Sequence, residues 1–229
     1  MTVTIPEVNI YTQNPWLERI HPEKALFRGE AYEVAKRLLD VFILIIGLPV
    51  WLPLLAVCAL LIKIESPQDP AMFVQERTGR GGKRFKMYKF RTMVVHAEEI
   101  KSEIMHLNEL MWPDFKIADD PRVTRMGRFL RITSLDELPQ VFNVIKNDMS
   151  LVGPRPTSFS PEVYALWHTE RLDVMPGITG LWQILGRGST EFDERLKMDI
   201  AYIEKRCLWL DFQILIRTVI AVFQNKGAY

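Results

Sequence analysis

The side chains best placed to do chemistry are Asp136 and Glu137, two adjacent carboxylates at the start of a predicted helix. An apolar stripe at spacings of three and four follows them, formed by Leu138, Val141, Phe142 and Ile145. Free amides and the helix dipole stabilise negative charge at such an N-terminus. The pair therefore fits two interpretations. One is a reactive or metal-binding carboxylate, and the other is a capping box made by Ser134 and Glu137.

A rigid turn, Gly153-Pro-Arg-Pro156, follows the same helix. The two prolines stiffen the backbone around Arg155, and a guanidinium held in this way is well suited to binding phosphate. An ordinary turn with a surface arginine explains the same four residues. The turn alone leaves both interpretations open.

Three stretches together carry a family resemblance. They are Thr133 to Pro156, Tyr88-Lys-Phe-Arg-Thr-Met93 and Pro176-Gly-Ile-Thr-Gly-Leu-Trp-Gln183. In this combination the chain resembles the bacterial sugar transferases, the monotopic phosphoglycosyl transferase family. The resemblance extends from about Lys36 to the C-terminus.

This resemblance implies a reaction at Asp136. Asp136 attacks the β-phosphorus of a UDP-sugar, UMP leaves, and a membrane polyprenyl phosphate (undecaprenyl phosphate) then takes the phosphosugar. The product would begin a surface polysaccharide, such as an exopolysaccharide or a lipopolysaccharide. A carboxylate nucleophile facing a diphosphate needs its repulsion screened, so we expect Mg²⁺, with Asp136 and Glu137 as ligands.

Several cations are predicted to bind the substrate phosphates. Arg155 lies in the rigid turn, and Arg131 lies five residues before Asp136 and matches the family pattern. Lys89 and Arg91 belong to the second stretch, although basic residues on a strand also fit a solvated face or contact with lipid headgroups. Arg187, after Gly186 in a glycine-rich loop, is a weaker candidate for a nucleotide or phosphate contact.

The whole sequence has 229 residues and a formal net charge of +1. That length suffices for one domain with an appendage, and the charge gives no reason to expect nucleic acid as a partner. The two cysteines cannot form a disulfide framework, which fits a cytoplasmic catalytic part.

An uncharged run from Val41 to Ile62 predicts a membrane segment, because about twenty apolar residues can span a bilayer. Pro49 and Pro53 lie near its centre and bend or break a helix there. A kinked transmembrane helix is one alternative, since such helices tolerate proline. A re-entrant helix-break-helix that enters and leaves by the same face is the other.

Basic residues flank both ends of this run, with Lys36-Arg37 before it and Lys63 after it. Because basic flanks mark the cytoplasmic side, the re-entrant interpretation is favoured. The resemblance implies the same, with Pro53 at the bend. It also exposes a departure: the family often has Ser-Pro there, whereas this chain has Leu52-Pro53. Leucine cannot bond the carbonyls that proline frees.

We therefore predict an α+β fold, mostly helical with a small β-hairpin over Met72–Arg77 and Arg84–Arg91. The expected parts are an extension (1–30), the re-entrant membrane helix (31–66) and a cytoplasmic catalytic domain (67–229). Residues 208–223 are apolar but contain Asp211 and Arg217, so they would lie in the membrane interface or pack on the core. The protein would be monotopic in the inner membrane of a bacterium, and a homodimer is possible.

Two other classes fit parts of the sequence. A lipid-binding scaffold without catalysis would use the basic strand and would tolerate loss of Asp136. A hydrolase would use Asp136 and Glu137 as acid and base, but neighbours on one helix start are poorly arranged to flank a scissile bond.

Overall fold

The computed structural model describes residue 10 and residues 14–109, 115, 117, 119–159, 166–185 and 192–223. Its α-helices are α2 (Pro15–Glu18), α3 (Gly29–Glu65), α4 (Ala97–Lys101), α5 (Arg125–Ile132), α6 (Val141–Ile145), α7 (Leu181–Leu185), α8 (Phe192–Lys205) and α9 (Leu208–Phe223). The 3-10 helices are η1 (Pro22–Lys24), η2 (Arg80–Gly82), η3 (Met105–Leu107), η4 (Leu135–Gln140) and η6 (Leu166–Asp173). The strands are β1 (Met72–Thr78), β2 (Arg84–Phe90), β3 (Ser150–Val152) and β4 (Gly177–Thr179). The predicted class, mostly helical with little sheet, is confirmed.

The predicted hairpin is confirmed as the antiparallel pair β1 and β2, in which Met72 pairs with Phe90 and Thr78 with Arg84. Its turn contains Gly81 and Gly82, both at positive φ, a backbone conformation that glycine adopts without steric cost. The buried side chains of β2 are Phe85, Met87 and Phe90. β3 and β4 form a separate parallel pair.

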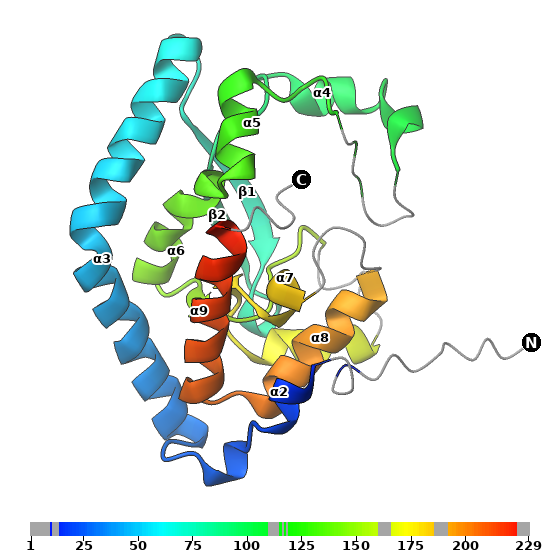
Figure 1. Ribbon diagram of the computed structural model, residues 1–229. Coiled ribbons are helices and arrows are strands. Elements are labelled where there is room, and N and C mark those ends of the chain that lie inside the picture. The colour runs from blue at the N-terminus through cyan, green and yellow to red at the C-terminus, as the bar shows by residue number, and fades with distance from the viewer. Residues whose placement is uncertain are drawn as a thin grey trace, which may run out of the picture.

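Helix α3 is one continuous helix of 37 residues with Pro49 and Pro53 inside it. Figure 1 shows that it bends near its middle, with the rest of the molecule on its concave side. The predicted break is therefore a bend within a continuous helix. Two prolines remove two backbone donors, and a bend accommodates this loss.

Trp51 provides the polar contact at the bend that Leu52 cannot make. Its indole N–H donates to the backbone carbonyl of Leu44 over 2.8 Å. Gly47 gives the ring room, because a Cβ there would lie 3.3 Å from the Trp51 ring. The same ring meets Phe142 of α6 edge-on, with centroids 6.2 Å apart. The bend is thus fixed by an indole and is in contact with the body of the protein.

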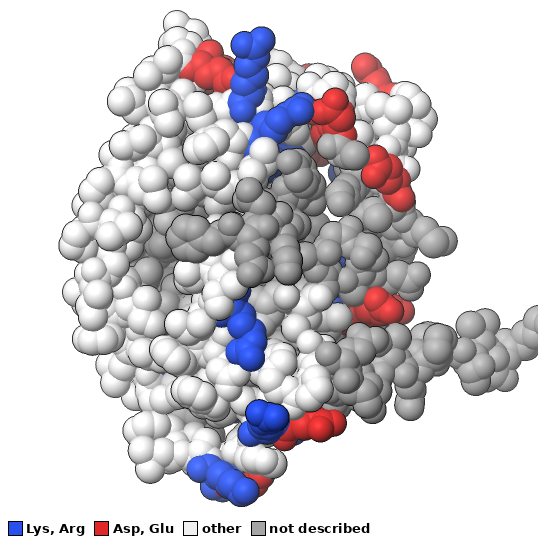
Figure 2. Space-filling view, in the orientation of Figure 1, with Lys and Arg blue, Asp and Glu red and all other residues white. Residues whose placement is uncertain are grey.

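The two faces of α3 differ along its whole length. Its inner face buries seven residues, namely Tyr32, Lys36, Asp40, Leu44, Leu55, Cys58 and Ile62. Its outer face exposes large apolar side chains, including Val34, Leu38, Phe42, Ile45, Val50, Val57, Leu60 and Ile64. Figure 2 shows this side of the molecule, at the left edge, as free of charged residues. Among the described residues, α3 is the one helix long and apolar enough to cross a membrane.

Helix α9 has the bounds predicted for it and packs one face on the core. Leu210 and Ile214 are fully buried. The opposite face exposes Trp209, Phe212, Ile216, Val219 and Ile220. Packing on the core is therefore shown for one face, and contact of the other face with a membrane remains a prediction.

Candidate active site

Four predicted site residues come together from separate elements. Lys89 lies on β2, Asp136 and Glu137 lie on η4, and Arg155 follows β3. Helix η4 packs against β2, which brings the carboxylates to the strand. Residues far apart in the chain therefore converge on one place.

The backbone of β2 is held there by Asn143 of α6, whose side chain is fully buried. Its Oδ1 accepts from the Tyr88 N–H over 3.0 Å, and its Nδ2 donates to the Lys86 carbonyl over 2.7 Å. These bonds fix the strand just before Lys89. Sequence reasoning missed Asn143, and the available signal was a polar residue within the apolar run that follows Pro139.

The capping-box interpretation of Ser134 and Glu137 is wrong. Ser134 has a left-handed backbone, with φ of 57°, and its side chain makes no capping hydrogen bond. The backbone there leads into a 3-10 helix rather than an α-helix. Glu137 does not reach back to the helix start because cations from two other elements bind its carboxylate.

The Glu137 carboxylate is bound at both oxygens. Lys89 Nζ donates to Oε1 over 2.9 Å, Arg155 Nη1 donates to Oε2 over 3.0 Å, and Arg155 Nη2 also donates to Oε1. Burial by itself would raise the pKa of Glu137, but Arg155 and Lys89 outweigh it and hold this pKa well below its usual range. Glu137 is therefore a fixed anion that orients two cations.

Asp136 is in the opposite situation. Within the described part of the chain, no hydrogen bond or ion pair is made to its carboxylate, and it lines a cavity of about 740 Å³. Burial and the neighbouring Glu137 carboxylate raise the pKa of Asp136, although Lys89, Arg155 and Arg131 partly offset them. The site thus pairs a bound carboxylate with one that faces the cavity.

Three further predicted residues have different placements. Arg131, at the end of α5, lines the cavity and donates from Nε to Thr92 Oγ1 over 2.9 Å. Arg91 also lines the cavity, but its Nε bonds the Pro70 carbonyl over 2.8 Å. Arg187 lies outside the described residues.

The charges around the cavity favour an anionic ligand. The cations that line it include Lys89, Arg91, Arg122, Arg131, Arg155 and Arg171. Fewer carboxylates line it, namely Glu98, Asp120, Asp136 and Asp199. Arg171 was not singled out from the sequence, because nothing in its local pattern separates it from a surface arginine.

The described residues contain no cluster of three or more His, Cys, Asp or Glu side chains that could hold a metal ion. Mg²⁺ commonly uses only one or two carboxylates together with substrate phosphates and water. Asp136 fits such a role because its oxygens are not engaged by a cation. Glu137 would first have to exchange Lys89 or Arg155 for the metal.

The cavity and its carboxylates lie inside a segment that matches a known family. The family described as bacterial sugar transferase matches residues 31–225. Three relatives have printed names that describe their activity. The galactosyl transferase CpsE of Streptococcus agalactiae is 46% identical over 209 residues, which cover 88% of this chain and 45% of the relative.

The undecaprenyl-phosphate galactose phosphotransferase of Salmonella typhimurium is 45% identical over 172 residues, covering 73% of this chain and 36% of the relative. The UDP-glucose:undecaprenyl-phosphate glucose-1-phosphate transferase of Caulobacter vibrioides is 41% identical over 208 residues, covering 87% of this chain and 73% of the relative. The chain spans less than half the length of the first two relatives. With the family match over nearly its whole length, the chain belongs to the bacterial sugar transferase family.

Proposed function

We propose that this protein transfers a sugar 1-phosphate from a UDP-sugar to a membrane polyprenyl phosphate, undecaprenyl phosphate, and so initiates a surface polysaccharide. The observation that carries the proposal is the contrast at η4. Glu137 is held by Lys89 and Arg155, whereas Asp136 faces the cationic cavity without a partner among the described residues. The names of the relatives from Salmonella typhimurium and Caulobacter vibrioides support the same reaction and acceptor.

In the first step, a carboxylate oxygen of Asp136 attacks the β-phosphorus of the UDP-sugar. A new oxygen–phosphorus bond forms, and the bond from that phosphorus to the bridging oxygen breaks. UMP leaves with the electron pair, and the phosphosugar remains on Asp136 as an acyl phosphate. Arg155 and Lys89, oriented by Glu137, stabilise the negative charge on the phosphoryl oxygens and on the leaving phosphate.

In the second step, a phosphate oxygen of the polyprenyl phosphate attacks the same phosphorus. The bond to Asp136 breaks, which restores the carboxylate and releases the sugar as a polyprenyl diphosphate. Both displacements move anions toward each other, so bound Mg²⁺ would supply screening and Lewis acidity, with Asp136 and the substrate phosphates as its ligands.

The proposal places α3 in the bilayer as a re-entrant helix. Both halves of α3 bond the same body of the protein. Arg37, near its start, donates to the carbonyls of Val144 and Ile145 over 2.6 and 3.1 Å. Glu65, at its end, accepts from the Met126 N–H over 3.2 Å. A helix bonded in this way at both ends cannot place those ends on opposite sides of a membrane.

The basic flanks of α3 put both ends on the cytoplasmic side. The exposed apolar faces of α3 and α9 would then enter the bilayer. Labelling of cysteines placed at Glu30 and at Pro67 tests this arrangement in inverted and right-side-out vesicles. A membrane-impermeant reagent should reach both positions from the cytoplasmic side, and labelling from opposite sides would refute re-entry.

The reaction is tested by measuring nucleotide release from a panel of UDP-sugars, with polyprenyl phosphate and Mg²⁺ present. We expect UMP with at least one sugar and no release after chelation of the metal. Release of UDP would mean direct sugar transfer and would remove the role given to Asp136. No release from any donor would favour a lipid-binding scaffold.

A further inference from the structure

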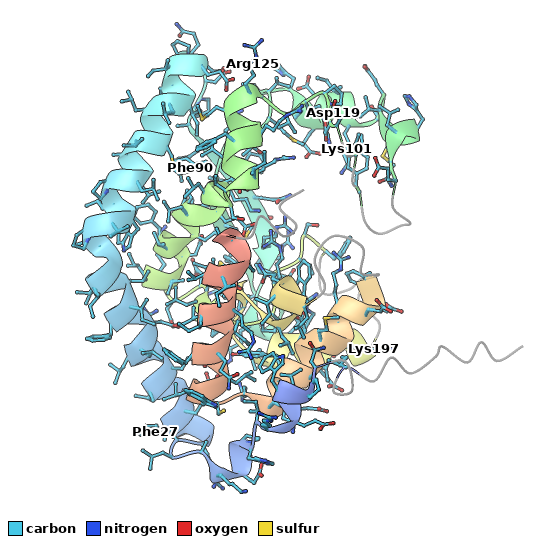
Figure 3. All side chains as sticks on the ribbon, in the orientation of Figure 1. Phe27, Phe90, Lys101, Asp119, Arg125 and Lys197 are labelled. Atoms are coloured by element: carbon cyan, nitrogen blue, oxygen red, sulfur yellow. The ribbon has the colours of Figure 1, made fainter. Side chains whose placement is uncertain are left out.

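The cavity at Asp136 reaches two groups of side chains that differ in chemistry. One group lies at α4 and includes Lys101 and Phe115. The other lies at α7 and α8 and includes Trp182, Phe192 and Asp199. Figure 3 shows that α4, with Lys101, and α8, with Lys197, lie on opposite sides of this region. The donor nucleotide can therefore extend from Asp136 in either of two directions.

The polar groups at the α4 end already bond one another. Arg122 donates from Nε and Nη2 to the Asp120 carboxylate over 2.9 and 2.6 Å, and from Nη1 to the Ala97 carbonyl over 3.0 Å. Phe115 lies between Lys101 and Arg122, 5.2 Å from each cation. Side chains engaged in this way have little capacity left for a ligand.

The α7–α8 end instead presents flat aromatic surfaces. The Arg195 guanidinium lies over the Trp182 ring at 5.3 Å and over the Phe192 ring at 5.7 Å. Phe159 meets Phe192 edge-on, with centroids 5.9 Å apart. These rings are only partly buried and line the cavity. Aromatic and guanidinium planes of this kind are the surfaces on which nucleobases stack.

Asp199, at the same end, is 1% exposed and has unused hydrogen-bonding capacity. Arg171 Nη2 lies 2.7 Å from its Oδ2, but among the described residues neither oxygen receives a hydrogen bond of good geometry. A buried carboxylate needs several donors. Burial raises the pKa of Asp199 to about 6, and Arg171 and Arg195 counter it only in part. Vicinal hydroxyl groups of a ligand are suitable donors for such a carboxylate.

Arg171 connects this end to the reacting carboxylates. Its Nη2 also donates to the backbone carbonyl of Arg155, whose side chain binds Glu137. The order along the cavity is thus Asp136, then the two arginines, then Asp199 with the aromatic rings. A donor with its β-phosphorus at Asp136 would place its α-phosphate at the arginines and its nucleoside beyond them.

We infer that the α7–α8 end of the cavity binds the nucleoside half of the donor, with the base on Trp182 and Phe192 and the ribose hydroxyls at Asp199. This assignment rests on the proposed function, because it takes a UDP-sugar as the donor. A hexose can also use an aromatic ring and a carboxylate, so the test must separate ribose from sugar.

The test measures binding of UMP and of a hexose 1-phosphate to the full chain by calorimetry. Trp182→Ala should weaken UMP binding about tenfold or more, because it removes a stacking surface. Hexose 1-phosphate binding should not change. The matched control is Phe115→Ala, which removes an aromatic ring at the α4 end and should leave UMP binding unchanged. If Phe115→Ala weakens UMP binding and Trp182→Ala does not, the assignment is reversed and the inference fails.

The role of Asp199 is tested with 2′-deoxy-UMP, which lacks one of the ribose hydroxyls. Wild-type protein should prefer UMP over 2′-deoxy-UMP about tenfold, and Asp199→Asn should lose most of that preference. A purely structural role would weaken both nucleotides equally and leave their ratio intact. Because the ratio is measured within one protein, partial unfolding cannot produce the expected result.

Failure of this inference can be distinguished from failure of the proposed function. Wild-type protein that binds UMP and releases it from a UDP-sugar, while both variants keep wild-type UMP binding and selectivity, would overturn only the assignment of the nucleoside. Wild-type protein that neither binds UMP nor releases it would overturn the proposed function, and the inference with it.

Discussion

Two buried carboxylate clusters in this protein look alike in composition and differ in how completely they are bonded. The anchor cluster joins α3 to α9 through Asp211, which is 2% exposed. Asp211 accepts from Lys36 over 2.9 Å and from Tyr32 over 2.8 Å at Oδ2, and from Tyr202 over 2.7 Å at Oδ1. The catalytic cluster holds Glu137 equally well but leaves Asp136 facing the cavity.

The difference separates a structural role from a chemical one. In the anchor cluster one cation and two hydroxyls complete the bonding of one carboxylate, so there is nothing left for a substrate. In the catalytic cluster Lys89, Arg155 and Arg131 surround two carboxylates, and one of these has no bond among the described residues. That surplus of donors, together with a free carboxylate, suits a reaction on an anionic ligand.

The largest expected effect is on turnover by Asp136→Asn. We expect UMP release to fall roughly 10⁴-fold or more, because the amide cannot act as the nucleophile. The melting temperature should stay the same or rise, because burial disfavours the charge of Asp136. Substantial turnover by the purified variant would remove the proposed difference between the clusters.

The next largest effect is on stability, from Asp211→Asn in the anchor cluster. This change leaves Lys36 buried without its counter-ion, which costs about 3–5 kcal/mol. Thermal unfolding in detergent should show the loss. The double variant Lys36→Met/Asp211→Leu should recover much of it, since it removes both charges. A double variant as unstable as the single one would mean that the hydroxyl bonds, and not the ion pair, hold α3 to α9.

Glu137→Gln should have an intermediate effect and change the pH profile. We expect kcat to fall about 100-fold, because Lys89 and Arg155 lose the anion that orients them. The acid limb of kcat should also move. In wild type, Asp136 has a raised pKa, partly because of Glu137, so activity should fall as pH drops through a value above that of a free carboxyl group.

Without Glu137 the remaining cations lower the pKa of Asp136, and the acid limb should therefore shift to lower pH. A profile that keeps its position in Glu137→Gln would show that another group controls the acid limb.

The smallest effect is expected at the bend of α3. Trp51→Phe keeps the ring but loses the indole N–H that bonds the Leu44 carbonyl. The cost should be about 1 kcal/mol, seen as a lower melting temperature. Adding Leu52→Ser should restore part of this, because a serine hydroxyl can bond the carbonyls that Pro53 frees. If Trp51→Phe alone has no effect, the indole bond does not stabilise the bend.

Local pattern determined much of this protein. The uncharged run with its two prolines predicted the bent α3, the alternation around a glycine turn predicted β1 and β2, and the apolar run at 208–223 predicted α9. Each of these depends on neighbours in the chain, which periodicity reports directly. The residues that meet at the site were also present in the sequence, as the acidic pair and the Gly-Pro-Arg-Pro turn.

Only the tertiary structure decided which member of the acidic pair is bound. Glu137 is held by Lys89, 48 positions away, and by Arg155, 18 positions away. The anchor contact between Lys36 and Asp211 joins residues 175 positions apart. A spacing pattern cannot predict such contacts, because packing of distant elements creates them. For the same reason the sequence favoured a helix cap at Ser134, and the cations that draw Glu137 away became apparent only in the fold.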